Sequence, residues 1–421
     1  MRIGINFIIL PHMVNVPVLL VIGYVWPEPN SSAAGTRMLQ LLSRFRQEEW
    51  RIVFATVAQK SGFEFNLFDW GIESQEIQLN DASFDDFVAA LQPQMVLFDR
   101  FMIEEQFGWR VAKHCSQALR ILDTEDLHFL RHARHTAWKE EREVRLSDLQ
   151  SDYAKREIAS ILRCDCTLVI STFEMDLLLR EFNLDAKILY YYPLLMEADE
   201  AVLPNFEERV DFIFIGNFWH EPNWQAVKYL KEKVWPILAN LVPKAKMQIY
   251  GAYPSQKVLQ LQQVKQRFIV NGRAADALEV VRMARVCLAP LLFGAGLKGK
   301  LLEAMKCGTP SVTTWVGAEG IADAQDWPGF VANEPEEIAK AAAQLYVDAE
   351  YWNRMQAKGF TVLANRFRPK LHEDALMAHF EGLRQNLDAH RQANFLGAIL
   401  QHHTLASTEY MSRWIEAKGG K

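Results

Sequence analysis

The stretch APLLFGAGLKGKLLEAMKCGTPSVTTWVGAEG, residues 289–320, reads as a strand, a glycine-rich turn, a helix, a second turn and a second strand. The first turn carries three glycines, at Gly294, Gly296 and Gly299. Glycine removes the side chain where a backbone has to approach a ligand, and the helix that follows presents free N–H groups to an anion. Lys298 and Lys300 add two positive charges there. The stretch therefore predicts an anion-binding turn at the end of a strand in an α/β domain.

Short apolar runs surround this stretch, and helical patterns lie between them. The runs are apolar on both faces, which is typical of a parallel sheet covered by helices. They span 18–25, 51–57, 94–99, 119–124, 167–172 and 187–192 in the first half and 211–216, 246–250, 267–271, 285–290 and 310–314 in the second. The alternation predicts two doubly wound, Rossmann-like α/β domains that face each other across a cleft, at the carboxyl ends of the strands.

The alternation lapses over residues 194–210, whose prolines and acidic residues are typical of a linker. We therefore expect an N-terminal domain over 1–193, a C-terminal domain over 211–385 and a helical tail over 386–421. The tail is amphipathic in part, and we prefer packing on the body over contact with a partner. Residues 1–12 are expected to be a short extension, with Met13 as an alternative start.

The apolar N-terminus predicts a buried strand rather than a membrane span or a signal peptide. Polar residues and prolines interrupt it before the roughly 20 apolar residues that a span needs. No small-residue cleavage site follows. VPVLLVIGYV is therefore expected to be the first strand of the first sheet.

Composition indicates a globular protein and argues against a dedicated nucleic-acid binder. Half of the 421 residues are hydrophobic and the net charge is -6, whereas nucleic-acid binders usually carry a basic excess. Nucleic acid is therefore not an expected partner. The five cysteines form no disulfide framework and no zinc-binding spacing, which favours a reducing, cytoplasmic location.

The glycines also satisfy G-x-G-x-x-G, so a dinucleotide-binding site is an alternative. The turn follows a strand and opens a helix, and Glu319 lies about 20 residues beyond Gly299, as that fingerprint requires. Against it, the fingerprint normally follows the first strand of its domain, whereas this turn comes late. Two lysines also suit a terminal diphosphate better than a pyrophosphate in the middle of a cofactor.

The quoted stretch resembles the donor-binding core of the retaining glycosyltransferases of family 4, which have the GT-B fold. Three further segments resemble other elements of that family and occur in the same order. They are VWPEPNSSAAGTR at 25–37, the first strand-to-helix loop; DTEDLHFLR at 123–131, the acceptor-side loop; and FIGNFWHEPN at 214–223, the first loop of the nucleotide-binding domain. The resemblance extends over residues 18–385.

The resemblance implies a nucleotide-sugar donor on the C-terminal domain and an acceptor that enters from the N-terminal one. Glu303 would hold the ribose, the turn from Gly294 to Lys300 would cradle the diphosphate, and Gly35 would let the N-terminal loop close over the phosphates. The expected donor-binding residues are Gly35, Arg37, Gly216, Asn217, Gly294, Gly296, Lys298, Lys300 and Glu303. Such enzymes need no bound metal and no cofactor besides the donor, because positive side chains and helix N-termini neutralise the leaving group.

The chain departs from the family pattern in its charged residues. Ala295 stands where many members have a first glutamate that touches the donor sugar, and Asn217 and Asn223 stand where many have Arg and Lys. Leu292 replaces an Arg of the most similar subset. Stabilisation of the leaving diphosphate then depends on three candidates, Lys298, Lys300 and Arg37. We expect at least one of the lysines to point into the cleft; the alternative is a pair of solvated surface lysines.

Asp126 and His128 are the expected catalytic residues because they follow the predicted strand at 119–124, at the end that faces the cleft. By resemblance, His128 contacts the donor sugar and Asp126 binds an acceptor hydroxyl. The alternative for His128 is a residue that caps or packs under the following helix. Asp99 and Arg100 are weaker candidates by the same strand-end argument.

The alternating charges of RHARHTAWKEEREVR, residues 131–145, allow two interpretations. A solvated helix face is preferred over peripheral contact with anionic lipid at the inner face of a membrane. The sequence thus predicts a glycosyltransferase that moves a sugar, with retention, to a glycan, lipid-linked or small-molecule acceptor in surface polysaccharide or glycoconjugate synthesis. The alternative function is a catalytically silent GT-B module that binds a nucleotide sugar or a partner protein.

Overall fold

In the computed structural model, which describes residues 16–199 and 203–419, the apolar runs of the first half form a parallel sheet. Its strands are β1 (Val18–Gly23), β2 (Arg51–Thr56), β3 (Glu73–Glu76), β4 (Met95–Asp99), β5 (Leu119–Asp123), β6 (Cys166–Val169) and β7 (Leu189–Tyr191). The order β3-β2-β1-β4-β5-β6-β7 reverses direction at β1, which pairs with both β2 and β4. The extension expected at 1–12 lies outside the described residues.

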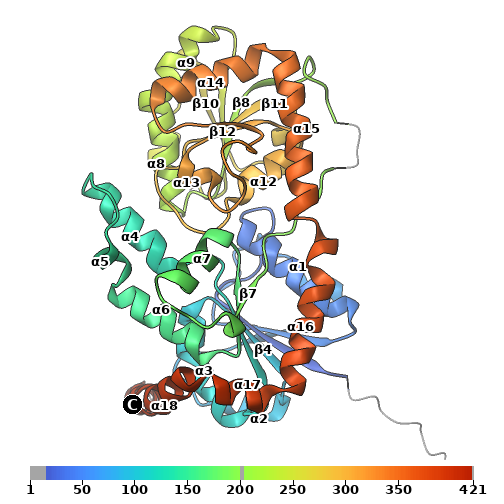
Figure 1. Cartoon of the computed structure of the whole chain (residues 1–421), viewed down its shortest axis with the longest axis vertical. Helices are drawn as coiled ribbons and strands as arrows, with labels where there is room; N and C mark the ends of the chain where they lie inside the picture. Colours follow the sequence, from blue (N-terminus) through green and yellow to red (C-terminus); the bar gives the residue numbers. More distant parts are fainter. Residues whose placement is uncertain (1–15, 200–202, 420–421) are drawn as a thin grey trace, which may run out of the picture.

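Helices connect these strands and cover both faces of the sheet (Figure 1). They are α1 (Ala33–Gln47), α2 (Ser83–Leu91), α3 (Phe101–His114), α4 (His128–Lys139), α5 (Leu146–Leu149), α6 (Asp152–Arg163) and α7 (Thr172–Arg180). Residues of the central strands are almost fully buried because helices lie on either side, as the two-faced apolar runs predict.

The second half repeats this plan with a six-stranded parallel sheet of order β10-β9-β8-β11-β12-β13. Its strands are β8 (Val210–Ile215), β9 (Met247–Tyr250), β10 (Phe268–Gly272), β11 (Ala284–Ala289), β12 (Ser311–Thr313) and β13 (Gly329–Val331). Its helices are α8 (Glu221–Tyr229), α9 (Trp235–Leu241), α10 (Gln256–Leu259), α11 (Ala277–Met283), α12 (Gly299–Lys306), α13 (Trp315–Ala318), α14 (Pro335–Val347) and α15 (Ala349–Arg366). Two doubly wound domains are therefore confirmed.

Two edge strands were not predicted from the sequence. β3 reads ESQE and all four of its residues are exposed, so it has no apolar pattern. β13 has only three residues, and its Gly329 allows close approach to the backbone of Ser311 on β12. Both strands are recognisable only from their pairing with β2 and β12.

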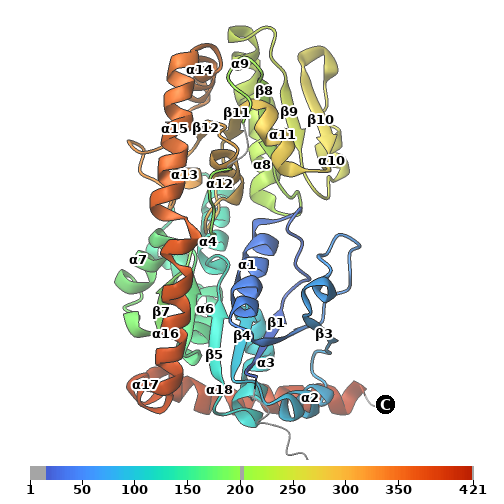
Figure 2. The same ribbon diagram turned by 90° about the vertical axis from the view of Figure 1, so that its right-hand side faces the viewer.

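The chain returns to the first domain at its end (Figures 1 and 2). α16 (Glu373–Gln385), α17 (Leu387–Ala393) and α18 (Phe395–Gly419) follow α15. Leu376 and Phe380 of α16 belong to the hydrophobic core beneath β1, β2 and β4. The expected end of the second domain at residue 385 is therefore too late, because α16 buries its apolar face against the first domain. α18 packs along α3 and α6, so the tail does pack on the body.

An apolar cluster joins the two domains on one side of their interface. Ile170 and Leu194 of the first half pack with Leu297 and Leu301 of the second. This contact brings the glycine-rich turn before α12 against the strand ends of the first sheet. Among residues 16–199 and 203–419, there is no helix with the length and apolar character needed to cross a membrane.

Candidate functional site

The glycine-rich turn between β11 and α12 lies against the first domain. Gly296 has φ +64°, a left-handed conformation that favours glycine, and a Cβ there would lie 2.8 Å from the Cβ of Asp126. A Cβ on Gly299 would overlap the Cβ of Ala33 at the start of α1. The glycines thus allow the donor-side turn to touch the acceptor-side loop and bring the N-termini of α1 and α12 together.

Lys298 and Lys300 leave the turn in different directions, and the alternative of two solvated surface lysines is wrong. Lys298 is buried and its Nζ donates to the carbonyl of Gly296 at 2.7 Å. Lys300 is half-buried, donates to Oδ1 of Asn223 and lies over the ring of Phe214. Burial lowers the pKa of each ammonium to about 8. Lys300 therefore faces the first loop of the second domain, and Lys298 faces the first domain.

The loop after β8 contains Gly216 and Asn217, which the sequence assigned to the donor site. A Cβ on Gly216 would lie 2.8 Å from Nζ of Lys300, so this glycine makes room for the ammonium. Asn217 organises the loop itself: its side-chain oxygen accepts from the amide of Trp219 at 2.9 Å, and its carbonyl accepts from Asn223 at 2.7 Å. Lys300 and Asn223 thus form a polar pair beside the glycine.

Glu303 lies one turn into α12 and is half-buried. Within the described residues, its carboxylate makes no hydrogen bond. Burial raises its pKa, and the positive charge of Lys300 opposes that effect. The carboxylate is therefore free to accept hydrogen bonds from ligand hydroxyls.

Arg37 does not contact the cleft, and its assignment to the donor phosphates is wrong in this structure. It is completely buried, and its Nε and Nη2 bind the carboxylate of Asp123 at 3.1 and 2.8 Å. Its Nη1 donates to the carbonyl of Tyr192. The guanidinium ties α1 to the ends of β5 and β7. The sequence made it a candidate as one of three available cations, but the carboxylate of Asp123 at the end of β5 binds it instead.

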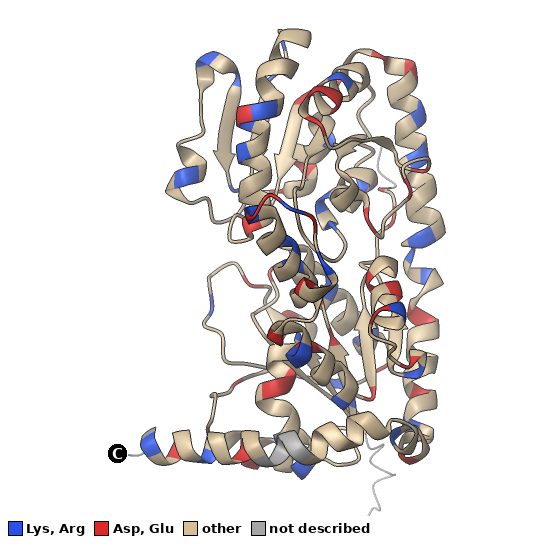
Figure 3. Cartoon of the chain, turned by 60° about the vertical axis from the view of Figure 1, so that its left-hand side comes forward, with Lys and Arg blue, Asp and Glu red and all other residues tan. Residues whose placement is uncertain are grey.

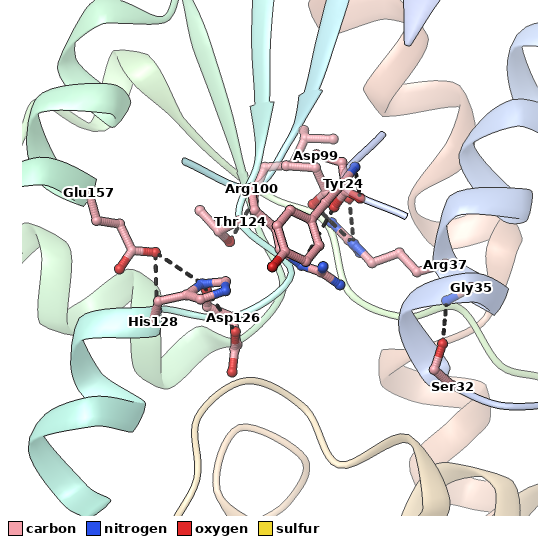
Figure 4. A network of polar contacts seen from close by, with 12 residues as sticks. Tyr24, Ser32, Gly35, Arg37, Asp99, Arg100, Thr124, Asp126, His128 and Glu157 are labelled. Carbon is pink, nitrogen blue, oxygen red and sulfur yellow. Dashed lines mark hydrogen bonds and ion pairs between the residues drawn. The ribbon is translucent and has the colours of Figure 1, made fainter. Parts of the chain in front are cut away.

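Gly35 lies in the first turn of α1, and its amide donates to Oγ of the N-cap residue Ser32 at 3.1 Å (Figure 4). A Cβ on Gly35 would overlap the backbone of Glu28. The glycine thus lets the loop before α1 fold tightly over the helix N-terminus.

Asp126 and His128 lie together at the carboxyl end of β5, as predicted (Figure 4). The carboxylate of Asp126 is paired with Arg131, and Nδ1 of His128 lies 3.1 Å from the carbonyl of Asp126. Burial disfavours the Asp126 carboxylate, but the charges of Arg131 and His128 outweigh it and lower the pKa. His128 packs edge to face on Phe101, and the backbone amide of His128 donates a hydrogen bond to Glu157 at 3.1 Å. His128 therefore packs at the start of α4, beside Asp126.

A second polar group lies at the end of β4, beside Asp126 (Figure 4). Asp99 accepts the amide of Tyr24 at 2.9 Å, and its Oδ1 is buried without a hydrogen-bond partner. Arg100 has φ +73° and lies over the ring of Tyr24. Glu125 has φ +60°, and burial together with Asp123 and Asp99 raises its pKa well above the usual value. Backbone strain of this kind gathers at functional sites.

Sequence reasoning missed two charged side chains of the first domain that reach the glycine-rich turn. Nη1 of Arg134 on α4 donates to the carbonyl of Gly294 at 2.8 Å. Oε1 of Glu174 on α7 accepts from the amide of Gly296 at 2.8 Å. Glu174 follows Ser171 by three residues, a spacing that indicates a capping box within its own helix. The serine makes no such cap, and only the position of Glu174 after a strand hinted at the cleft.

Three of the four arginines of the charged segment 131–145 are paired with acidic side chains of the chain. Arg131 binds Asp126, Arg134 binds Glu319, and Arg142 binds Glu140 and Asp148. Figure 3 shows acidic and basic residues interspersed along the ribbon. These three arginines therefore have acidic partners within the chain, and contact with anionic lipid is not supported.

The dinucleotide alternative is not favoured by the geometry. The turn follows β11, the fourth strand of its domain, rather than β8. Glu319, which would have to bind a ribose, is held by both terminal nitrogens of Arg134 at 2.7 and 2.8 Å. No group of three or more His, Cys, Asp or Glu side chains in the described parts of the chain is arranged to hold a metal ion.

Comparison with known proteins agrees with these features. Residues 209–348 match the glycosyl transferases group 1 family. A search of curated proteins finds no match. Three similar solved structures are sucrose-phosphate synthase from Thermosynechococcus elongatus (14% identity, TM-score 0.60, covering 87% of this chain and 99% of that one), HepE from Anabaena in complex with UDP and glucose (12%, 0.65, 87% and 100%) and the pneumococcal O-GlcNAc transferase GtfA in complex with UDP and GlcNAc (11%, 0.63, 88% and 99%). The GT-B fold is thereby confirmed.

Proposed function

Because its second domain matches the glycosyl transferases group 1 and its two domains form a GT-B fold, we propose that this chain is an enzyme that transfers a glycosyl group from a nucleoside diphosphate sugar to an acceptor hydroxyl. The observation that carries the proposal is the contact between Gly296 of the glycine-rich turn and Asp126 of the acceptor-side loop. A donor on the turn then meets an acceptor at the strand ends of the first sheet.

The donor lies along α12 in this proposal. The Glu303 carboxylate accepts hydrogen bonds from the ribose, and the turn from Gly294 to Lys300 surrounds the diphosphate. Charge that develops on the departing diphosphate is stabilised by the Lys300 ammonium and by the N-termini of α12 and α1, which the contact between Gly299 and Ala33 brings together. These groups are preorganised, so they stabilise the transition state without reorganising.

The acceptor lies at the ends of β4 and β5. The carboxylate of Asp126 accepts a hydrogen bond from the hydroxyl group of the acceptor, and His128 lies beside the donor sugar. Nδ1 of His128 donates to the carbonyl of Asp126, and within the part of the chain that the structure describes Nε2 has no hydrogen-bond partner, so in the neutral ring Nε2 can accept from a sugar hydroxyl. Retention in this proposal rests on the resemblance to the family: the acceptor hydroxyl attacks the anomeric carbon from the face that the diphosphate leaves, without a covalent intermediate.

The proposed reaction needs no metal and no cofactor besides the donor. Lys300 and the two helix N-termini supply the positive potential that a divalent cation would otherwise provide. We place the reaction in the cytoplasm, in the synthesis of surface polysaccharides or glycoconjugates. Support for a reducing location comes from the five cysteines, which are buried thiols with no disulfide among them. The acceptor is a glycan, a lipid-linked glycan or a small molecule.

Thermal stability in the presence of nucleotides tests the proposal. UDP, GDP, ADP, dTDP and NAD are each added with magnesium and with EDTA. A ligand at 100 times its Kd stabilises the fold by about 2.7 kcal/mol, which is a measurable shift in Tm. We expect one nucleoside diphosphate to stabilise in EDTA, and Lys300→Ala to remove the effect. Lys340→Ala, an exposed lysine on α14, is the control that keeps it. Stabilisation by NAD alone would overturn the proposal.

A binding module without transfer is the second candidate, and Ala295 favours it. This residue replaces the glutamate that the family uses at the donor sugar, and it packs against the core of the first domain. The two functions differ in product formation. The assay uses sugar conjugates of the nucleoside diphosphate that stabilises the fold. Acceptor-dependent release of that nucleoside diphosphate supports transfer. Binding of the conjugate without release supports the binding module.

A further inference from the structure

Glu174 connects the two halves of the candidate site through a single oxygen atom. Oε1 accepts from the amide of Leu127 at 2.9 Å and from the amide of Gly296 at 2.8 Å. Leu127 is the residue between Asp126 and His128, and Gly296 is in the donor-side turn. Glu174 itself is completely buried on α7. One carboxylate therefore holds the acceptor-side loop and the donor-side turn at a fixed separation.

Arg134 holds the same turn from its other end. Its guanidinium donates to the carbonyl of Gly294 at 2.8 Å and is itself fixed by Glu319. The turn is thus bound at two peptide groups, one by a cation and one by a carboxylate, and both side chains belong to the first domain.

The environment of Glu174 is unusual for a carboxylate that only stabilises a fold. Its Oε2 is buried and makes no hydrogen bond to any described residue. The charged groups that face it are Asp126 from the loop after β5 and Lys298 from the turn. Burial and the negative charge of Asp126 raise the pKa of Glu174 to about 8. Buried carboxyl groups are usually fully hydrogen-bonded, and exceptions gather at functional sites.

We propose that Glu174 is a positioning residue for glycosyl transfer, which fixes the distance between the donor-side turn and the Asp126–His128 loop without touching substrate. This inference rests on the proposed function. Misplacement of reacting groups by about 1 Å can cost about 100-fold in rate, so a residue that sets this distance controls turnover. Donor binding by Lys300 and Glu303 does not depend on it, because neither side chain contacts Glu174.

Two substitutions separate positioning from simple structural support. Glu174→Ala leaves two buried amides without an acceptor, whereas Glu174→Gln keeps an oxygen at the same place. We expect Glu174→Ala to lower kcat by about 100-fold with donor KM changed less than about threefold. Glu174→Gln should keep kcat within about fivefold. Glu104→Gln is the matched control: Glu104 is a buried carboxylate of α3 paired with Arg163, and it should lower stability but not the kcat of the folded protein.

Hydrogen exchange supplies a readout that needs no activity. In the wild-type full-length chain, the amides of Leu127 and Gly296 should exchange slowly. Both should exchange at least about tenfold faster in Glu174→Ala and remain slow in Glu174→Gln and Glu104→Gln. Unchanged exchange in Glu174→Ala, or equal losses of kcat in Glu174→Ala and Glu104→Gln, would overturn the inference. If the wild-type chain transfers no sugar, the proposed function fails, and the exchange rates alone then decide whether Glu174 joins the two segments.

Discussion

Gly296 lies directly against Asp126, although 170 residues separate them in the chain. A Cβ on Gly296 would stand 2.8 Å from the Cβ of Asp126 and 3.2 Å from the carbonyl oxygen of Glu125. The donor-side turn and the acceptor-side loop therefore meet at a glycine, where the backbone of one domain rests on a side chain of the other. The closeness of the two halves of the site depends on the absence of one methyl group.

Replacement of Gly296 by alanine should separate these halves. The added methyl group meets Asp126, and its φ of +64° costs an alanine about 1–2 kcal/mol. We expect a loss of kcat of at least about 100-fold, measured as nucleoside diphosphate release with acceptor present. Gly382→Ala on α16 is the control, since no atom lies within 4 Å of the added Cβ. Full activity of Gly296→Ala would show that the domains do not need this contact.

Donor affinity should weaken as pH rises through about 8. Burial lowers the pKa of Lys300 to about 8, so the ammonium loses its proton above that value and no longer attracts a diphosphate. The test is the Kd of the preferred nucleoside diphosphate between pH 6.5 and about 9.5, by calorimetry. Lys300→Met should bind weakly with a flatter pH dependence. Lys298→Met should keep the wild-type dependence, because Lys298 faces the first domain. An unchanged slope in Lys300→Met contradicts the assignment.

Arg37 is expected to matter for stability rather than for donor binding. Removal of one partner of a buried ion pair costs about 3–5 kcal/mol, and Asp123 is buried with Arg37. Arg37→Met should therefore lower the free energy of unfolding by that amount in urea denaturation. The folded fraction should bind nucleotide with unchanged Kd. A stable Arg37→Met with weakened binding would restore the role that the sequence indicated.

Stability should depend on pH through Glu174. Its pKa is about 8 in the folded chain and near 4.5 when unfolded. The unfolded state therefore releases this proton first, and the stabilising contribution is complete below pH 4.5 and is lost as pH rises through 8. Glu174→Gln does not titrate, so its stability relative to wild type should increase over this range, by at most about 1.4 kcal/mol per pH unit. Denaturation at several pH values measures the difference; a constant difference contradicts the raised pKa.

His128 should contribute to turnover and its neighbour His132 should not. His128 lies beside Asp126 at the start of α4, whereas His132 is exposed one turn later and stacks on Tyr153. We expect His128→Ala to lower kcat by about 100-fold. His132→Ala should change it less than about twofold. Circular dichroism of both variants checks that α4 is intact. Equal effects of the two substitutions would assign His128 to packing alone.

Much of the fold follows from the sequence because buried parallel strands have a strong local signature. Eleven apolar runs each became a strand, whereas β3 and β13 were missed because pairing partners, not side chains, define them. The predicted domain boundary at residue 385 was too late, also because it depends on a packing partner. The apolar face of α16 is visible in the sequence, but the domain against which it packs is not.

The site was predictable where a residue acts through its own turn or strand end, as with Asp126, Gly216 and Gly296. The prediction of a residue's role was wrong or missing where its binding partner lies far along the chain. Arg37 has the right position for a phosphate ligand, but Asp123, 86 residues away, binds it. Glu174 has the spacing of a helix cap, but its partner is 122 residues away. Local patterns report the element on which a side chain sits, and tertiary contacts decide what it binds.

The return of α16 and α17 to the first domain has a consequence for biosynthesis. Leu376, Phe380, Leu383 and Leu387 complete the core against β1, β2 and β4. A nascent chain folds from its N-terminus as it leaves the ribosome. The first domain, however, lacks part of its core until residue 387 has emerged. An apolar face of its first 190 residues therefore stays exposed while the second domain is synthesised. We expect chaperones to bind that face during translation.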